Sequence, residues 1–225
     1  MLKALYNGKL TYPQKGIRGV CPLCENEVNA KCSILPNFTN HWAHLKKESC
    51  DTWSEGETPW HEIWKKTFGE GHFEKVREKG GKKHFADIFT ESEIVIELQN
   101  STIMPDVIIQ REDFYGEKML WVVNGHRFRL NFVMNFDPIE SKLSGREEYL
   151  YGWKWARNCW NVSNRPIFLD FEGDYIYRIF PNRWDGVKSG KAFRYTKKKF
   201  INKYGGDYNF FHMNSGDIYP SYSYL

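Results

Sequence analysis

The sequence predicts a mixed α/β fold, and three observations support this. Residues 94–99 alternate apolar and other side chains with the two-residue period of a β-strand. Residues 57–68 place apolar side chains at the i, i+3, i+4 spacing of a helix that covers a core. Residues 118–124 form a mostly apolar run rich in β-forming residues, as in a buried strand. We therefore expect a mixed central sheet flanked by helices.

Composition divides the 225 residues into three expected segments. Residues 1–54 are rich in Cys, Asn, Gly and Pro and have weak periodicity, so we expect short strands and turns that cannot build a core unaided. Residues 55–180 carry the helix and strand patterns and form the expected α/β core. Residues 181–225 are basic and aromatic and form an expected C-terminal extension.

The expected elements follow one another with short separations. The helix at 57–68 has Pro59 in its first turn and carries Trp60 and Trp64 on its apolar stripe. A charged, Gly-rich stretch separates this helix from the next strand. The remaining expected elements are, in chain order, strand 84–89, strand 94–99, a short helix near Pro105, strand 118–124, strand 127–136, strand 165–171, a turn at 172–174 and strand 174–180.

Charge and hydropathy limit the class of protein. Hydrophobic residues make up 41% of the chain and aromatic residues 17%, which indicates a folded globular protein. The net charge of +4 permits a nucleic-acid partner without requiring one. No run approaches the ~20 apolar residues that cross a bilayer, so we expect a cytoplasmic protein with no membrane partner. Five cysteines, an odd number, make a disulfide framework unlikely in that compartment.

Four of the five cysteines lie in the first fifty residues, close to two histidines. The motif CPLC is followed, after sixteen residues, by the motif HWAH. Together the two motifs supply thiolates and imidazoles in the number and type that a structural zinc site uses. The spacing between the histidines is shorter than in a common zinc finger, so a further cysteine could replace one of them. The expected Zn²⁺ ligands are Cys21, Cys24, His41 and His44, with Cys32 and Cys50 as alternatives.

Acidic side chains occur on the two strands at 84–89 and 94–99. Asp87 shares a face with two aromatic residues, and ten residues later Glu97 and Gln99 share a strand face. This pattern, in which one acid is followed about ten residues later by a second acid and a polar residue two positions apart, is typical of a divalent-metal site over a sheet. The alternative is the exposed face of an edge hairpin with scattered charges.

The helix at 57–68 carries a polar stripe beside its apolar one. Glu57, His61 and Lys65 recur at i, i+4 and i+8, so they line one side of the helix. If the apolar stripe packs on the sheet, these side chains lie near the acidic pair. Glu57 could then help hold a metal, and His61 or Lys65 could supply positive charge near an attacked phosphate. Ordinary surface decoration is the alternative.

A basic segment lies near the C-terminus. Residues 188–203 contain seven basic residues and no acidic one. The densest part, Lys197, Lys198 and Lys199, is a candidate for phosphate contacts. A solvated helix face explains the same pattern.

Six short motifs follow one another along the chain: CPLC, HWAH, GETPWHEIWK, HFAD, IELQNS, and Tyr115 followed by LWVVN. In this order they resemble the competence protein CoiA-like family over roughly residues 15–125, with Trp42 where the family has Phe. The resemblance implies a restriction-endonuclease-like core of the PD-(D/E)XK superfamily, preceded by a small zinc-binding segment. The C-terminal hundred residues carry no motif that matches.

The resemblance also implies roles for individual residues. Glu57 and His61 correspond to an acid and a histidine on the family's first helix, Asp87 to its first strand acid, and Glu97 and Gln99 to its E-x-Q element. Most superfamily nucleases have lysine where this chain has Gln99. Glutamine orients water but carries no positive charge, so charge stabilisation would fall on the metal, with Lys65 as a helper.

The leading hypothesis is a Mg²⁺- or Mn²⁺-dependent deoxyribonuclease that hydrolyses phosphodiester bonds, with single-stranded, duplex and branched DNA all open as substrates. A second hypothesis is a single-stranded-DNA-binding accessory protein that does not cut and serves DNA uptake, recombination, phage or defence. A third is a zinc-stabilised protein-interaction module. The intact set of acids favours the enzyme, because carboxylates repel a polyanion unless a cation lies between them.

Overall fold

The computed structural model describes the whole chain except residues 36–37, 46–49, 54–55, 140–146, 217 and 220–225. It is a mixed α/β protein with a large mixed sheet and flanking helices, as the sequence predicts. The chain forms two compact units, an N-terminal unit of Met1–Phe89 with Asn209–Leu225 and a C-terminal unit of Thr90–Tyr208. Each unit is described by itself. Within the described residues, no helix is both long and apolar enough to cross a membrane.

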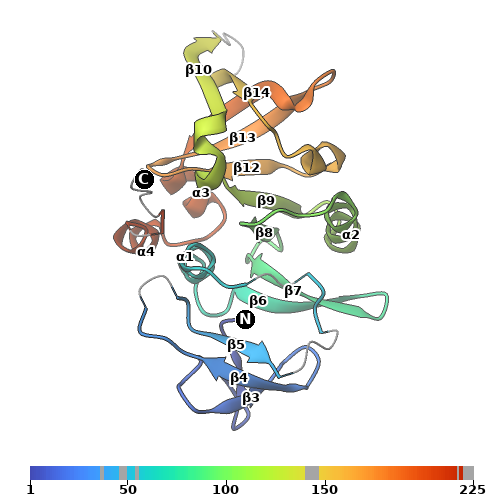
Figure 1. Ribbon diagram of the computed structural model, residues 1–225, viewed down its shortest axis with the longest axis vertical. Helices are drawn as coiled ribbons and strands as arrows, with labels where there is room; N and C mark the ends of the chain where they lie inside the picture. Colours follow the sequence, from blue (N-terminus) through green and yellow to red (C-terminus); the bar gives the residue numbers. More distant parts are fainter. Residues whose placement is uncertain (36–37, 46–49, 54–55, 140–146, 217, 220–225) are drawn as a thin grey trace. The chain divides into compact units, whose positions relative to one another are not determined.

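The N-terminal unit begins with a small antiparallel sheet in the order β2-β1-β3-β4-β5 (Figure 1). Its core holds Ala4, Val28 and Trp42 around the buried thiol of Cys21. Gly19 lies beneath Trp42, and a Cβ there would come within 2.9 Å of a backbone oxygen and 3.1 Å of the indole, so only glycine fits. The strands are β1 (Ala4–Tyr6), β2 (Lys9–Thr11), β3 (Arg18–Val20), β4 (Glu27–Lys31) and β5 (His41–His44).

Helix α1 (Pro59–Thr67) confirms the predicted helix and follows the small sheet. Thr58 caps it, and the Trp64 ring packs against the Phe211 ring of α4 (Tyr208–Asn214), with centroids 4.9 Å apart. The charged stretch that follows α1 is a strand, which the sequence analysis missed. It forms a hairpin of β6 (Phe73–Lys79) and β7 (Lys82–Phe89), joined by two glycines with positive φ, as a tight two-residue turn requires.

In the C-terminal unit the strands lie in the order β10-β11-β14-β13-β12-β9-β8. Strands β8, β9 and β12 are parallel, and the others are antiparallel, so the sheet is mixed. The strand bounds are β8 (Val95–Gln99), β9 (Met119–Asn124), β10 (Phe132–Ile139), β11 (Glu148–Trp153), β12 (Ile167–Asp170), β13 (Tyr175–Asn182) and β14 (Gly186–Thr196). The helices are α2 (Pro105–Tyr115) and α3 (Lys197–Lys203), with 3₁₀ turns η1 (His126–Asn131) and η2 (Asn158–Val162).

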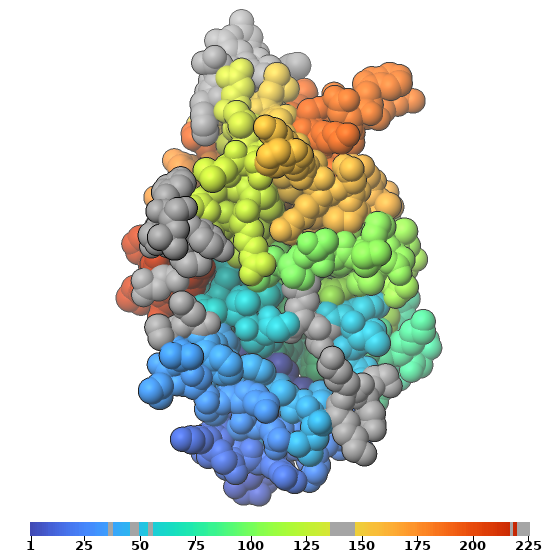
Figure 2. All heavy atoms as spheres, in the orientation of Figure 1, coloured from blue at the N-terminus to red at the C-terminus, as the bar shows by residue number. Residues whose placement is uncertain are grey.

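Most predicted elements of this unit are confirmed, and two details differ. The predicted strand 127–136 begins only at Phe132, because residues 126–131 form η1. Strand β8 was expected to have one polar face, yet all five of its residues are buried, as is usual for a parallel strand covered on both faces. The hairpin that joins β13 to β14 extends away from the rest of the unit (orange in Figure 1 and in Figure 2), and Trp184 near its tip is 85% exposed.

The two units differ from the segments expected from composition. The expected boundary at residues 54 and 55 falls inside the N-terminal unit, because α1 and the β6–β7 hairpin share buried contacts with residues 1–53. The expected extension from residue 181 is also divided, since β14 is an interior strand of the C-terminal sheet and α4 packs on α1. Composition could not show these long-range contacts.

Candidate metal centre and acidic cluster

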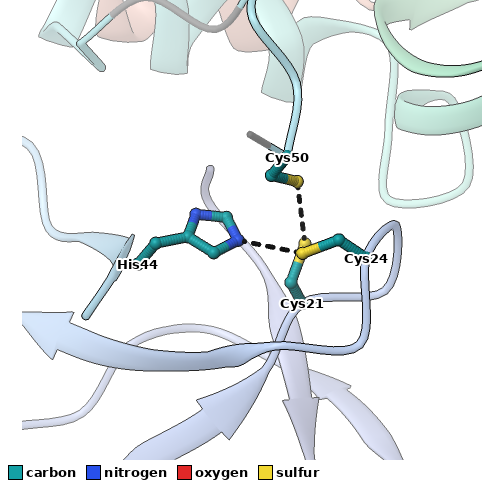
Figure 3. Close-up of side chains that lie close together, drawn as sticks. All are labelled: Cys21, Cys24, His44 and Cys50. Atoms are coloured by element: carbon teal, nitrogen blue, oxygen red, sulfur yellow. Dashed lines mark hydrogen bonds between the residues drawn. The ribbon is translucent and has the colours of Figure 1, made fainter. Parts of the chain in front are cut away.

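Four side chains of the N-terminal unit converge on one point (Figure 3). The ligand atoms of Cys21, Cys24, His44 and Cys50 all lie within 4.8 Å of one another. The sulfurs of Cys21 and Cys50 are 3.6 Å apart, and the Cys24 sulfur is 3.3 Å from Nε2 of His44. Ligands 2.0–2.3 Å from a tetrahedral zinc ion are about 3.3–3.8 Å from one another. The cluster therefore has the dimensions to hold a metal such as zinc.

The first two ligands are presented by the turn between β3 and β4. The backbone N–H of Cys21 donates to the carbonyl of Asn26 at 2.9 Å, and that of Glu25 donates to the carbonyl of Cys21 at 2.9 Å. The N–H of Leu23 points at the Cys21 sulfur, 3.4 Å away. This tight turn brings both thiols of the CPLC motif to one side, which is the geometry expected from its spacing.

The predicted ligand set requires one correction, because His41 does not belong to the cluster. His41 and His44 are three residues apart on strand β5, so their side chains point to opposite faces of the strand. On a helix the same spacing would have placed them together. The Nδ1 atom of His41 lies 2.8 Å from the carbonyl of Thr39. Of the two alternatives considered from the sequence, Cys50 takes the fourth place and Cys32 does not.

Cys50 is positioned by its neighbour Asp51, which the sequence analysis did not single out. One oxygen of this buried carboxylate lies 2.9 Å from Nδ1 of His84, and the other accepts from the backbone N–H of Phe85 at 2.9 Å. The Trp53 ring stacks on the His84 ring with centroids 3.3 Å apart. These contacts fasten the segment that carries Cys50 to strand β7, so they bear on the cluster without touching it.

Burial and hydrogen bonding set the pKa values of the three thiols in opposite directions. Burial raises the pKa of Cys21 and that of Cys50, because a thiolate is poorly solvated there. Burial also opposes the Cys24 thiolate, but hydrogen bonds, first that of the Asn26 backbone, outweigh it and lower the pKa of Cys24. A metal ion would reverse the preference of Cys21 and Cys50 for the protonated form, since it binds the thiolate and displaces the proton. All five cysteines are free thiols, so no disulfide competes for these sulfurs.

A second cluster of the N-terminal unit centres on the buried ammonium group of Lys65. Its Nζ lies 2.7 Å from Glu57, 3.2 Å from Glu74 and 3.2 Å from Asp87. The Lys65 side chain is 4% exposed and that of Asp87 is 22% exposed, so Asp87 is the carboxylate most open to solvent. Lys65 of α1 and the acid on β7 thus lie together, as expected, but Glu57 joins them from the segment before α1, because the helix begins only at Pro59. One ammonium group faces three carboxylates.

The ionisation of this cluster follows from burial opposed by charge. Burial alone would lower the pKa of Lys65, but the carboxylates of Glu57, Glu74 and Asp87 outweigh it and raise that pKa well above its usual value. Burial alone would raise the pKa of Glu57, yet Lys65 lowers it to about 2. Burial raises the pKa of Glu74 in spite of Lys65. Lys65 and Glu57 are therefore charged at neutral pH.

Glu74 was missed by the sequence analysis. It is the second residue of β6, in a stretch that looked like solvated charge, and its backbone has a positive φ of 50°. Its two oxygens accept from the backbone N–H of Leu2 at 2.8 and 2.9 Å, and one also accepts from Lys3 at 3.2 Å. Only the sheet pairing and the N-terminal strand turn this residue inward.

His61 takes a local position at the start of α1. Its ring Nδ1 is 2.8 Å from the hydroxyl of Thr58, which also accepts from the backbone N–H of His61. His61 is buried. These contacts belong to the helix cap, so they account for its burial without any ligand.

Glu97 and Gln99 belong to the C-terminal unit, whereas Asp87 belongs to the N-terminal one. Glu97 is 2% exposed and accepts a hydrogen bond from Arg111 of α2 at 2.8 Å. Gln99 is fully buried and donates to the carbonyl of Ser101 at 3.3 Å. Arg111 was not predicted, although a charged residue on the buried side of a helix was the available signal.

The predicted phosphate-binding lysines also require a correction. Lys197 is 2% exposed, and its ammonium group contacts the fully buried carboxylate of Asp170 at 2.8 Å and the carbonyl of Phe171 at 2.6 Å. A lysine held in this way is not available to DNA. Lys198 and Lys199 are exposed on α3. The run of three lysines at the first turn of α3 thus divides into one buried ion pair and two surface charges.

Comparisons with protein-family models, curated proteins and solved structures find no match. Function is therefore inferred from the chemistry of these residues and from the sequence motifs. Within the described part of the chain, Cys21, Cys24, His44 and Cys50 are the one group of three or more potential ligands that comes close enough to share a metal.

Proposed function

We propose that this protein is a divalent-metal-dependent nuclease that hydrolyses phosphodiester bonds in DNA, with a restriction-endonuclease-like core similar to that of CoiA-like proteins. The observation that carries the proposal is the gathering of Glu57, Lys65 and Asp87 in one partly open cluster. These are the residues to which the resemblance and the helix spacing assign the acid, the positive group and the first metal ligand.

The acids of this cluster support a cation-dependent reaction. Three carboxylates outnumber the two ammonium groups near them, that of Lys65 and the N-terminal one of Met1, which lies 3.8 Å from Glu57. Asp87, the most exposed of the three, would hold Mg²⁺ or Mn²⁺ through its outer oxygen. Lys65, 3.2 Å from Asp87, would orient this carboxylate. The metal, when bound, supplies the acidified water and the charge neutralisation that phosphodiester hydrolysis needs.

Glu97 and Gln99 are proposed to take part in the reaction because the resemblance matches them to the family's E-x-Q element. They follow Asp87 by ten and twelve residues, with one turn at residues 90–94 between the two strands. Arg111 fixes one oxygen of Glu97, and this carboxylate is the candidate metal ligand. Gln99 would orient water by hydrogen bonding, because it cannot carry charge.

The Cys and His cluster is proposed to hold Zn²⁺ in a structural role. Three thiols and one imidazole close a tetrahedral shell and leave no position for a reacting water. The strands around it are only three to five residues long, and their shared apolar core is small. A metal would supply the stability that such a segment lacks.

A cleavage panel tests the nuclease proposal. Labelled single-stranded, duplex and branched DNA are incubated with the full chain and Mg²⁺, Mn²⁺ or no divalent ion. We expect cleavage with at least one metal, and a loss of about a hundred-fold or more for Asp87→Asn and for Glu97→Gln, since each removes a ligand charge.

The matched control is Glu78→Gln, on exposed strand β6, which should cleave like the unaltered chain. Circular dichroism must show that the Asp87 and Glu97 variants remain folded. Cleavage unchanged in both folded variants would refute the assignment. DNA binding without any product under either metal would favour the non-cutting accessory protein.

A further inference from the structure

A groove in the C-terminal unit has none of the acids of the proposed cleavage site in its lining. It has a volume of about 560 Å³, within the range of roughly 300–1,000 Å³ common for ligand sites. Strands β13 and β14 form one part of its lining, and one side of helix α3 forms the other. Thr196 ends β14, and its hydroxyl accepts from the backbone N–H of Lys199 at 3.1 Å, which fixes how the helix leaves the sheet.

The lining is rich in positive charge. Arg178, Arg194, Lys199 and Lys203 contribute four cations, and among the described lining residues Glu147 is the one acid. Glu147 is already paired with Arg194, at 2.8 Å from its Nε. The structure pairs no carboxylate with the other three cations among its described residues. The groove therefore offers three uncompensated positive charges to an anionic ligand.

Aromatic rings share the groove with these cations. Tyr175 is 38% exposed, and the guanidinium of Arg194 lies 4.5 Å from its ring centroid. Tyr195 lines the groove half-buried, and Tyr204, which follows α3, lines it buried. The ammonium group of Lys203 lies 5.1 Å from the centroid of the Tyr204 ring, so charge and ring meet at this end of the groove.

We infer that this groove binds a single-stranded nucleic acid. Cations along a channel track the phosphates, and rings between them stack on bases that a single strand leaves accessible. A duplex offers phosphates but keeps its bases stacked inside, so the tyrosines would have no role. An acidic peptide would satisfy the cations and leave the rings without partners. The residues that line this groove are not among the proposed cleavage residues.

Fluorescence anisotropy tests the inference with the full, zinc-loaded chain and no added Mg²⁺ or Mn²⁺. The probe is a labelled oligothymidylate of about 12 nucleotides, a length that covers one such site. We expect the double variant Lys199→Glu/Lys203→Glu to bind at least ten-fold more weakly and to have a salt slope shallower by about 1.4. Tyr175→Ala should weaken binding by roughly ten-fold with the salt slope unchanged.

Lys154→Glu/Lys188→Glu is the matched control, because both lysines are exposed residues of the C-terminal unit that do not line the groove. It makes the same change in charge and should change the affinity less than two-fold. An equal loss in this control would show a diffuse charge effect and overturn the inference. The inference would also be overturned if Lys199→Glu/Lys203→Glu lost as much affinity for poly-glutamate or anionic vesicles as for the oligonucleotide. Because no cleavage is measured, an inactive nuclease would leave this result unaffected.

Discussion

The N-terminal unit contains two clusters of ionisable side chains that differ in how their charge is balanced. Cys21, Cys24, His44 and Cys50 have no lysine or arginine among them, and a bound metal would supply the positive charge that stabilises their thiolates. Glu57, Glu74 and Asp87 surround Lys65, so this cluster carries its own cation. The first cluster is expected to depend on an external ion for its stability, and the second to remain assembled without one.

This difference is the basis for proposing a structural role for the first cluster and a catalytic role for the second. Soft ligands in a closed shell favour zinc and exclude a reacting water. Hard carboxylates with a partly exposed member favour Mg²⁺ or Mn²⁺ and leave room for a substrate. Removing the metal from one cluster and the lysine from the other should therefore have distinct consequences.

Loss of the Cys and His centre should have the largest effect. Cys50→Ser should lower bound zinc from about one ion per chain to nearly none, because it removes one of the four ligands. The Tm should fall by about 10 °C or more, since the free energy of metal binding no longer stabilises the fold. Metal analysis and thermal unfolding measure both quantities. Cys32→Ser, a cysteine outside the cluster, is the control and should keep its zinc. Full zinc occupancy in Cys50→Ser would remove this residue from the ligand set.

Replacement of the central lysine should rank next. Lys65→Met leaves three carboxylates without their cation and should lower the free energy of unfolding by about 3–5 kcal/mol. The pKa of the carboxyls should then rise in the folded state, so the variant should regain stability as pH falls from 7 toward 4. Lys66→Met, which breaks only the half-exposed pair with Glu62, should cost about 1 kcal/mol or less. Equal losses in the two variants, measured by urea unfolding, would contradict the central role of Lys65.

The pH dependence of Glu57 gives a smaller and more specific test. Its pKa is about 2 in the folded protein and near its usual value of 4.5 when unfolded. Its ionised form therefore stabilises the fold by about 3 kcal/mol above pH 4.5, and this is lost as pH falls toward 2. The difference in unfolding free energy between the unaltered chain and Glu57→Gln should shrink over that range. A difference independent of pH would show that the charge of Glu57 does not contribute.

The smallest expected effect distinguishes the two histidines of the HWAH motif. His41→Ala should retain zinc and change the Tm by less than about 3 °C, because its ring points away from the cluster. His44→Ala should lower zinc affinity by at least ten-fold. Competition with a chromophoric chelator measures both affinities. Zinc loss in His41→Ala alone would restore the ligand set first expected from the sequence.

Local pattern was enough to predict much of the fold. The periodicity of α1, β7, β8, β9, β12 and β13 reflects backbone geometry that each segment carries by itself. The same pattern failed where a 3₁₀ turn interrupts residues 126–131 and where a charged stretch became β6. In both places the neighbouring chain, and not local hydropathy, selected the conformation.

The sequence by itself determined which residue types could form a metal centre and an acidic cluster, because CPLC is a local turn and Glu57 and Lys65 are brought together by a helix that starts two residues after Glu57. Only the tertiary structure decided that Cys50 replaces His41, that Glu74 joins Lys65, that Arg111 holds Glu97 and that Lys197 is buried against Asp170. Each of these choices joins residues that are distant in the chain or depends on which face of a strand or helix is covered. Spacing fixes the direction of a side chain relative to its own backbone, whereas its partner depends on how the segments pack.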